Sequence, residues 1–354
     1  MLSVTPSGSV TLQDIAAKAG VSISTASRSL TGAVSVSKNA QARVLSAAKE
    51  LGYRHNPLVG EVMRAARRGS ANHHLGTLAY ITPCEDVQEW RATPTLCRHW
   101  SAARDQAARF GFGVSEFALS SHGMTGRRLG DILRARGISG ILLAAFPNEP
   151  FELVLPWEHF VTVPVGHMIR DPQLDCVVSD HTQAVLLSGR VLAERGYRRI
   201  GLAMESYQNA ITNHGWVNGY AALPAENPRL AAIPPFLPEK MTAPAFMAWV
   251  KQNRVDCVLT LSTFRNAANP MRTWLGEGGL DCPRDVGLVS LDVTSATSAW
   301  AGIDQNSDEI GRAAVDLILS KVRAGERGIP KVHRSLLVHC CWREGNTVRA
   351  AAGA

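Results

Sequence analysis

Residues 14–30 read DIAAKAGVSISTASRSL. A helical pattern of small and apolar residues stops at Gly20, and a new one begins after Ser22. Gly20 supplies the backbone freedom that a tight turn needs, and Ser22 is a favoured residue for capping the helix that follows. The stretch therefore predicts a helix over about residues 12–18, a glycine turn, and a second helix over about residues 23–30.

A third helix is predicted after Ser37, which is a suitable cap, and it ends at Gly52. One face of this helix is apolar and carries Val44, Leu45, Ala48 and Leu51. Three short helices joined by a glycine turn form a helix-turn-helix domain, whose second helix enters the major groove of duplex DNA.

The second helix carries short hydroxyl side chains and one arginine. Ala26 and Leu30 are predicted to face inward, and small residues on the outer side let a helix enter a groove about 12 Å wide. The residues expected to reach base edges are Ile23, Ser24, Ser27 and Arg28. Ser22 and Thr25 are expected to contact phosphates. The alternative is that these hydroxyls are ordinary surface residues of a helix.

Charge is concentrated at the amino end of the chain. Residues 1–74 hold nine Lys and Arg residues against three Asp and Glu residues, while the whole chain has a net charge of +7. This asymmetry predicts a head that binds a polyanion and a nearly neutral body. A solvated basic surface is the alternative.

The chain has 354 residues, and the expected number of domains is two or three. The opening MLSVTPSGSV lacks the basic start and apolar core of a secretory signal. No apolar stretch reaches the roughly 18 residues of a membrane span. The seven cysteines contain no C-x-x-C pair, which favours reduced thiols and no metal site. We therefore expect a cytoplasmic, nucleoid-associated protein.

From Leu75 onward, strands alternate with helices, for example at 75–81, 113–119 and 138–144, and a helix is predicted over 266–276. This alternation predicts a doubly wound parallel sheet in each of two lobes. Ligands of such sheets bind at the carboxyl ends of the strands. Neither a nucleotide-binding glycine motif nor a catalytic constellation is found, so we expect no cofactor and no enzymatic activity.

Two long stretches, VTLQDIAAKAGVSISTASRSL and VSKNAQARVLSAAKELGYRHNP, resemble the head of the LacI/GalR family of transcription regulators. GYRRIGL (196–202) and CPRDVGLVSLD (282–292) resemble the periplasmic-binding-protein-like effector domain of the same family. The resemblance implies a sequence-specific DNA-binding regulator, most often a repressor, that acts as a homodimer on a near-palindromic operator and responds to a small-molecule effector of the sugar type.

The resemblance also assigns DNA contacts. It implies that Ile23 and Ser24 select the operator. Backbone contacts are expected at Thr11, Ser22, Thr25, Thr31 and Asn56, although Thr31 stands where the family usually has Asn. Residues 56–74 are expected to form a hinge helix and linker. There Val62, or its neighbour Met63, would be inserted into the minor groove.

For the effector, the resemblance implies two carboxylates, Asp180 and Asp292, that accept hydrogen bonds from sugar hydroxyls. The strand-end rule adds His167. Trp90, Trp216 and Trp300 could each pack on the apolar side of a sugar ring, but the leading interpretation for each is a core residue. Trp216 is taken as the candidate ligand contact, and it stands where the family often has an Arg, so one common polar contact is absent. Arg265 departs from the usual Asn-Asp and suggests an anionic or substituted ligand, or a charged rim residue.

The predicted domains are a flexible terminus (1–9), the helix-turn-helix head (10–55), the hinge (56–74), the effector domain (75–345) and a flexible tail (346–354). Besides repression, we weigh an effector-responsive activator. A solute-binding receptor for transport would have a similar body but predicts a signal peptide and no basic head. An enzyme on a doubly wound scaffold would need a catalytic constellation.

Overall fold

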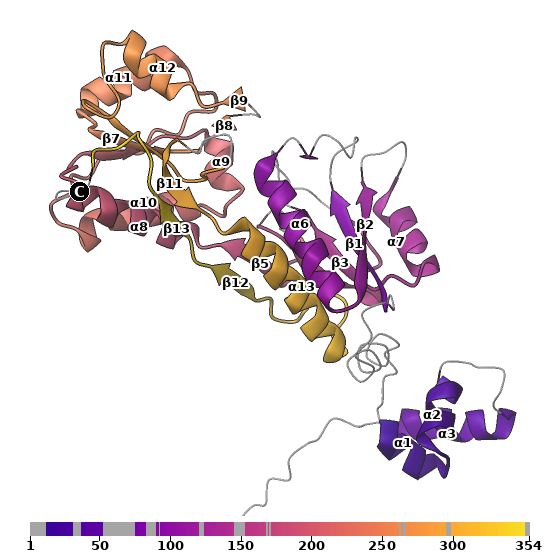
Figure 1. The fold of residues 1–354 in the computed structure, drawn as a ribbon. Coiled ribbons are helices and arrows are strands. Elements are labelled where there is room, and N and C mark those ends of the chain that lie inside the picture. Colours follow the sequence, from indigo (N-terminus) through magenta and orange to yellow (C-terminus); the bar gives the residue numbers. More distant parts are fainter. Residues whose placement is uncertain are drawn as a thin grey trace, which may run out of the picture. The chain divides into compact units, whose positions relative to one another are not determined.

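The structure is a computed structural model. It describes residues 12–30, 37–51, 75–82, 90–91, 93–119, 124–144, 153–167, 169, 171–261, 263–264, 267–294 and 299–350. The chain separates into two compact units, a head of three helices and a larger body (Figure 1). The predicted boundary between head, hinge and body falls within residues 52–74, outside the described residues, and stays a prediction.

The head contains α1 (Leu12–Ala19), α2 (Ile23–Leu30) and α3 (Lys38–Glu50), which confirms the three predicted helices. Ile15 and Val44 are fully buried at its centre. Gly20 joins α1 to α2 with a φ of +63°, a region that L side chains adopt only at a cost. Arg43 of α3 donates a hydrogen bond to the Gly20 carbonyl at 3.1 Å, which fixes this turn against the third helix.

The body begins with an amino-terminal lobe built on a parallel sheet of order β2-β1-β3-β4. Its strands are β1 (Gly76–Thr82), β2 (Phe112–Ala118), β3 (Gly140–Leu143) and β4 (Val161–Pro164). Helices α6 (Pro94–Arg109) and α7 (Gly126–Ala135) connect them. The strands β1 and β3 are almost completely buried, as expected for parallel strands covered on both faces.

The carboxy-terminal lobe has a second sheet of order β13-β11-β10-β7-β6. Its strands are β6 (Ile200–Leu202), β7 (Cys257–Thr260), β10 (Gly287–Ser290), β11 (Ala301–Asp304) and the antiparallel β13 (Cys341–Arg343). Around it lie α8 (His181–Glu194), α9 (Ser206–Ala210), α10 (Gly215–Glu226), α11 (Ala243–Asn253) and α12 (Met271–Glu277). The doubly wound fold predicted for the body is confirmed.

Three segments of chain pass between the lobes. One follows β5 (Cys176–Ser179), one precedes α13 (Ser307–Arg323), and one follows β12 (Ser335–Val338). The strands β5 and β12 pair in parallel, and α13 returns to the amino-terminal lobe beside α6 (Figure 1). Ser179 donates a hydrogen bond to the Gln305 side chain at 2.9 Å, and the Asp180 N–H donates to the Val338 carbonyl at 2.9 Å. The crossing segments are therefore bonded to one another.

Two predictions about the body need correction. Residues 346–350 are not a flexible tail, because Thr347 is fully buried and its hydroxyl bonds both the Ala301 N–H and the Leu288 carbonyl. The helix predicted over 266–276 begins only at Met271, since residues 267–268 belong to the short strand β9 (Ala267–Ala268), which pairs with β8 (Thr263–Phe264). Among the described helices, none combines the length and apolar character of a membrane span.

Candidate functional site

Helix α2 presents one buried and one open face. Ala26 is fully buried, whereas Ile23 is 48% exposed, and Ser24 and Arg28 are also exposed. The Arg28 Nε donates to the Ser24 carbonyl at 3.2 Å, so the guanidinium lies along the open face of the helix. The structure therefore brings Ile23, Ser24 and Arg28 together on the side that the sequence predicts to reach base edges.

The amino end of α2 carries a cluster of hydroxyl groups. The Ser22 Oγ accepts from the Thr25 N–H at 3.2 Å, which is the hydrogen bond of the predicted cap. The same oxygen lies 2.9 Å from the Ser24 Oγ and 2.8 Å from the Thr25 Oγ1. Donors at the amino end of a helix suit a phosphate group. Ser22 and Thr25 lie at this end of α2, and their phosphate contacts stay a prediction.

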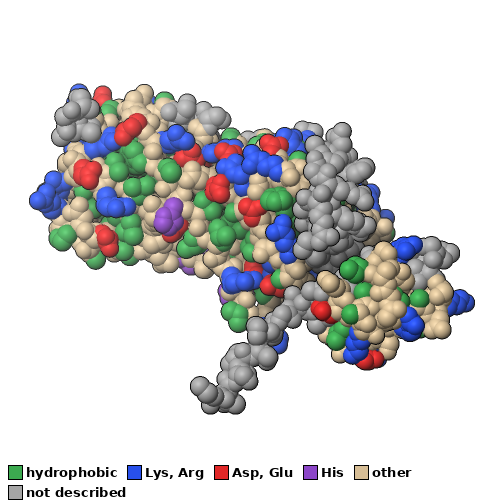
Figure 2. Space-filling model, turned by 60° about the horizontal axis from the view of Figure 1, so that its bottom comes forward, with side chains coloured by type: hydrophobic (Ala, Val, Ile, Leu, Met, Phe, Trp, Pro, Cys, Tyr) green, Lys and Arg blue, Asp and Glu red, His purple; other side chains and the backbone are tan. Residues whose placement is uncertain are grey.

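Basic side chains are spread over the head, and Figure 2 shows them in blue with few acidic ones among them. Lys18 pairs with Glu50 at 2.9 Å, across the packing of α1 against α3. Lys38 and Lys49 are exposed. The head thus carries exposed cationic side chains on α2 and α3, as binding of a polyanion requires.

Several predicted site residues lie outside the described part of the chain. These are Thr11, Thr31, Asn56, Val62, Met63 and Arg265, together with the side chain of Ser27. Their roles stay predictions that rest on the resemblance alone.

In the body, Asp292 lies two residues beyond the end of β10, where the sequence places an effector carboxylate. Its Oδ2 accepts a hydrogen bond at 2.9 Å from the Thr95 hydroxyl at the start of α6, in the other lobe. Burial raises the pKa of Asp292 to about 6, although the Thr95 hydroxyl and the nearby Arg98 partly oppose the shift. Asp292 is therefore a carboxylate at the junction of the lobes that changes charge near neutral pH.

Asp180 follows β5 directly and caps α8, because its Oδ1 accepts from the Gln183 N–H at 2.9 Å. Its Oδ2 lies 3.9 Å from the His339 Nε2. Asp180 and Asp292 both lie close to the Cys340 thiol. Burial and these carboxylates raise the pKa of Cys340 to about 12. The structure thus brings the two predicted carboxylates to the same part of the body.

Trp216 requires a correction. Its side chain is 1% exposed and belongs to the core of the carboxy-terminal lobe. One side of the indole is covered by His181, with 4.3 Å between ring centroids. The ring is packed as a core residue and offers no free face to a sugar. Trp216 lies in the first turn of α10, and its ring packs on His181 of α8, 35 positions earlier in the chain.

His167 lies near the same rings. Its Nδ1 is 3.9 Å from the Cys176 Sγ, and burial lowers its pKa. Burial, and then repulsion from His167, lower the pKa of His181 to about 3. Both imidazoles are therefore neutral at physiological pH and can serve as hydrogen-bond donors or acceptors rather than as charges.

The sequence did not predict a network of side-chain ion pairs where the two lobes of the body meet. Arg98 of α6 bonds Asp304 at 3.1 Å and Asp308 of α13 at 2.8 Å. Arg343 of β13 bonds the other oxygen of Asp304 at 2.9 Å. Burial opposes ionisation of Asp304, but these arginines and the Asn306 N–H outweigh it and lower the pKa. No sequence motif marks Arg98, because its partners lie about 200 positions away along the chain.

Two kinds of site are not formed by the described residues. No group of three or more His, Cys, Asp or Glu side chains is arranged to hold a metal ion within that part of the chain. The cysteines at 97, 176, 257, 282, 340 and 341 are all free thiols. Burial raises the pKa of Cys176, Cys257 and Cys282, which leaves them as unreactive core thiols.

Comparison with known families matches three regions of the chain. Residues 11–56 match the bacterial regulatory proteins of the lacI family. Residues 89–230 match the periplasmic binding proteins and sugar binding domain of the LacI family. Residues 190–346 match a periplasmic binding protein-like domain. Together these matches extend over the head and nearly all of the body.

Individual proteins agree with these matches. The HTH-type transcriptional regulator MalR of Streptococcus pneumoniae is 23% identical over 349 residues, which cover 93% of this chain and 98% of MalR. The regulator CelR in complex with cellobiose has a TM-score of 0.59 at 20% identity, covering 96% of this chain and 99% of CelR. The lac repressor dimer bound to its operator and an anti-inducer has a TM-score of 0.55 at 18% identity, covering 97% and 100%.

Proposed function

Because the chain belongs to the lacI family of bacterial regulatory proteins, we propose that it represses transcription as a dimer on a near-palindromic operator, under the control of a carbohydrate-type effector. It is a DNA-binding transcriptional regulator. The observation that carries the proposal is the open face of α2, where Ile23, Ser24 and Arg28 stand exposed on a basic head. Repression is supported by the similarity in fold to the lac repressor, whose structure has been solved on its operator.

We propose the following DNA contacts. Arg28 clamps a guanine through its two-pronged guanidinium, and Ser24 and Ser27 bond base edges, while Ile23 makes apolar contact with a thymine methyl group. Phosphates are held by Thr11, Ser22, Thr25, Thr31 and Asn56. Val62 or Met63 of each hinge enters the minor groove, where unstacking of the bases costs a few kcal/mol and is offset by contacts of the bent duplex.

The effector is proposed to bind in the body, near Asp180 and Asp292. Ionised carboxylates accept hydrogen bonds from adjacent hydroxyls of a pyranose. His167, whose ring lies beside Cys176, is proposed to supply a neutral donor or acceptor to the ligand, and Arg265 to contact a ligand that carries a negative group. The cellobiose complex of CelR, a protein of the same fold, supports a carbohydrate. The protein is proposed to act in the cytoplasm on chromosomal DNA.

Control of DNA binding follows from the position of Asp292. Its bond to Thr95 joins the two lobes, so an effector that competes for this carboxylate favours one arrangement of the lobes over another. A preference of about 1–3 kcal/mol is enough to change operator affinity several-fold or more.

Selection of binding sites from random duplexes by the full-length protein tests the proposal. The selection is run at moderate ionic strength with no sugar and with a panel that includes maltose, cellobiose and phosphorylated sugars. We expect a near-palindromic consensus whose recovery changes with one member of the panel. If the consensus strengthens transcription from a reporter promoter when the protein is present, the protein is an activator. No preference among duplexes under any condition would overturn the proposal.

A further inference from the structure

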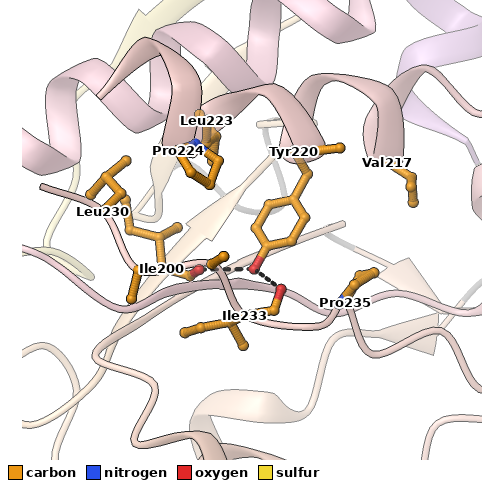
Figure 3. A pocket seen from close by; sticks show the side chains of 11 residues that line it. Ile200, Val217, Tyr220, Leu223, Pro224, Leu230, Ile233 and Pro235 are labelled. Atoms are coloured by element: carbon orange, nitrogen blue, oxygen red, sulfur yellow. Dashed lines mark hydrogen bonds between the residues drawn. The ribbon is translucent and has the colours of Figure 1, made fainter. Parts of the chain in front are cut away.

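A cavity of about 210 Å³ lies in the carboxy-terminal lobe between α10 and the chain segment 230–235 (Figure 3). Its floor consists of Ile200, Tyr220, Leu223, Leu230 and Ile233, each at most 6% exposed. Its rim includes residues that face solvent, among them the exposed residue Ala221. None of these residues belongs to the proposed DNA or effector contacts.

The cavity has a clear structural origin. Segment 230–236 covers the outer edge of β6, where the Ala231 N–H bonds the Arg198 carbonyl and the Phe236 N–H bonds the Leu202 carbonyl, both at 2.8 Å. Between these two bonds lie Pro234 and Pro235, which have no N–H to donate. The segment is therefore held near its two ends by bonds to β6, and between them the Tyr220 hydroxyl and the Trp249 Nε1 donate to the Ile233 and Pro234 carbonyls. It spans the space below α10 rather than filling it.

Two backbone carbonyls at the wall share one hydroxyl donor. The Tyr220 hydroxyl lies 3.0 Å from the Ile200 carbonyl and 2.9 Å from the Ile233 carbonyl, as Figure 3 shows. A hydroxyl has one proton, so it cannot fully satisfy both oxygens at once. Pro224 lies inside α10 and lacks the N–H that would bond the Tyr220 carbonyl four residues earlier. No charged side chain lines the cavity.

We propose that this cavity is a second ligand site, for an uncharged molecule about the size of a substituted benzene ring that carries one hydroxyl donor. An apolar cavity of about 150 Å³ binds benzene, so one of this volume has room for a ring with one or two substituents. The apolar floor excludes sugars and anions, because their polar groups would lose water without replacement. A hydroxyl on the ring supplies a second donor for the two wall carbonyls that share the Tyr220 proton.

The probe for this site is 4-methylphenol, with binding to the full-length protein measured by saturation-transfer NMR and calorimetry. We expect saturable binding that is about fivefold tighter than for 4-methylanisole, which has the same shape but no donor. Ala221→Phe places a ring in the cavity and is expected to weaken binding at least tenfold. The matched control is Ala225→Phe, at an exposed position of the same helix that does not line the cavity, and it should change binding less than twofold.

Three results would overturn the inference. If wild-type protein shows no saturable binding of 4-methylphenol, the cavity is not a ligand site. If 4-methylanisole binds equally well, the ligand does not need a hydroxyl donor. Sedimentation in which Ala221→Phe, but not Ala225→Phe, changes the oligomeric state would assign this surface to a second copy of the chain. Since the readout is binding to the body, none of these results depends on DNA recognition or on the proposed effector.

Discussion

Replacement of Asp175 by Asn tests how the crossing segments of the body are held together. Asp175 is 1% exposed as a residue and lies immediately before β5. Its carboxylate accepts a hydrogen bond from the Lys321 ammonium, near the end of α13. It also accepts hydrogen bonds from the backbone N–H of Arg334, at 2.7 Å, and from the Arg334 Nη2, at 2.8 Å. Arg334 lies just before β12. One buried charge thus joins three elements that are distant in sequence.

The loss of stability expected for Asp175→Asn depends on which partners of the carboxylate can be solvated instead. The amide introduced by Asp175→Asn keeps an oxygen for the Arg334 N–H, and the Arg334 guanidinium is 61% exposed and can be solvated. Lys321 is only 5% exposed, so it keeps a single partner, Glu326, which is itself partly solvated. Leaving a buried charge with an incomplete partner costs about 3 kcal/mol. For a body of this size that corresponds to a fall in melting temperature of about 6–12 °C.

The assay is urea and thermal unfolding of the full-length protein, followed by tryptophan fluorescence. Arg334→Met is the control and should leave the midpoint nearly unchanged. Asp175→Asn combined with Lys321→Met should cost less than the two single changes added together, because the double variant leaves no unpaired charge. A single Asp175→Asn variant as stable as wild type, or strict additivity in the double variant, would refute this account of the pair.

Three further predictions concern the proposed sites. Arg28→Ala should remove the sequence preference at one operator position and weaken operator binding by about 1–3 kcal/mol, whereas the control Lys49→Ala should keep that preference. An unchanged consensus in duplex selection would show that other residues read the bases. Effector affinity should fall about tenfold between pH 7 and pH 5, because protonation of Asp292, whose pKa is about 6, removes the acceptor. Asp292→Asn should remove this pH dependence of effector affinity. A wild-type affinity that does not change near pH 6 would contradict the proposed role of Asp292 as a ligand acceptor. Gly20→Ala should destabilise the head by about 1–2 kcal/mol through its positive φ, and unchanged amide exchange in α1 and α2 would argue against this.

The three helices of the head could be predicted because their signals are local, although Leu45, predicted on the apolar face of the third helix, is 51% exposed. The cap at Ser22, the turn at Gly20 and the burial of Ala26 each depend on neighbours within one turn of helix or one tight turn. The strands predicted at 75–81, 113–119 and 138–144 were also marked by short runs of β-branched and apolar residues, and each lies within two residues of its predicted bounds.

The errors arise where distant parts of the chain decide the outcome. Residues 346–350 are polar enough to read as a tail, but Thr347 bonds Ala301 and Leu288, Arg349 bonds Tyr197, and Val348 is buried in the core. Trp216 occupies a family position for ligand contact, but His181 on another helix covers its ring. Neither partner can be inferred from spacing along the sequence.

The same nonlocal contacts connect the proposed effector site with the buried charge at Asp175. Asp175 and Arg334 precede β5 and β12, whereas Asp180 follows β5 and its N–H bonds Val338, the last residue of β12. The two strands, each four residues or about 13 Å long, therefore carry an ion pair at one end and a proposed ligand contact at the other. A paired strand unit moves as one body more readily than it stretches, so a ligand that displaces Asp180 must also act on the bonds to Lys321 and α13. If the effector binds at Asp180 as proposed, we expect this ion pair to resist the displacement and to add to the free energy that binding must supply.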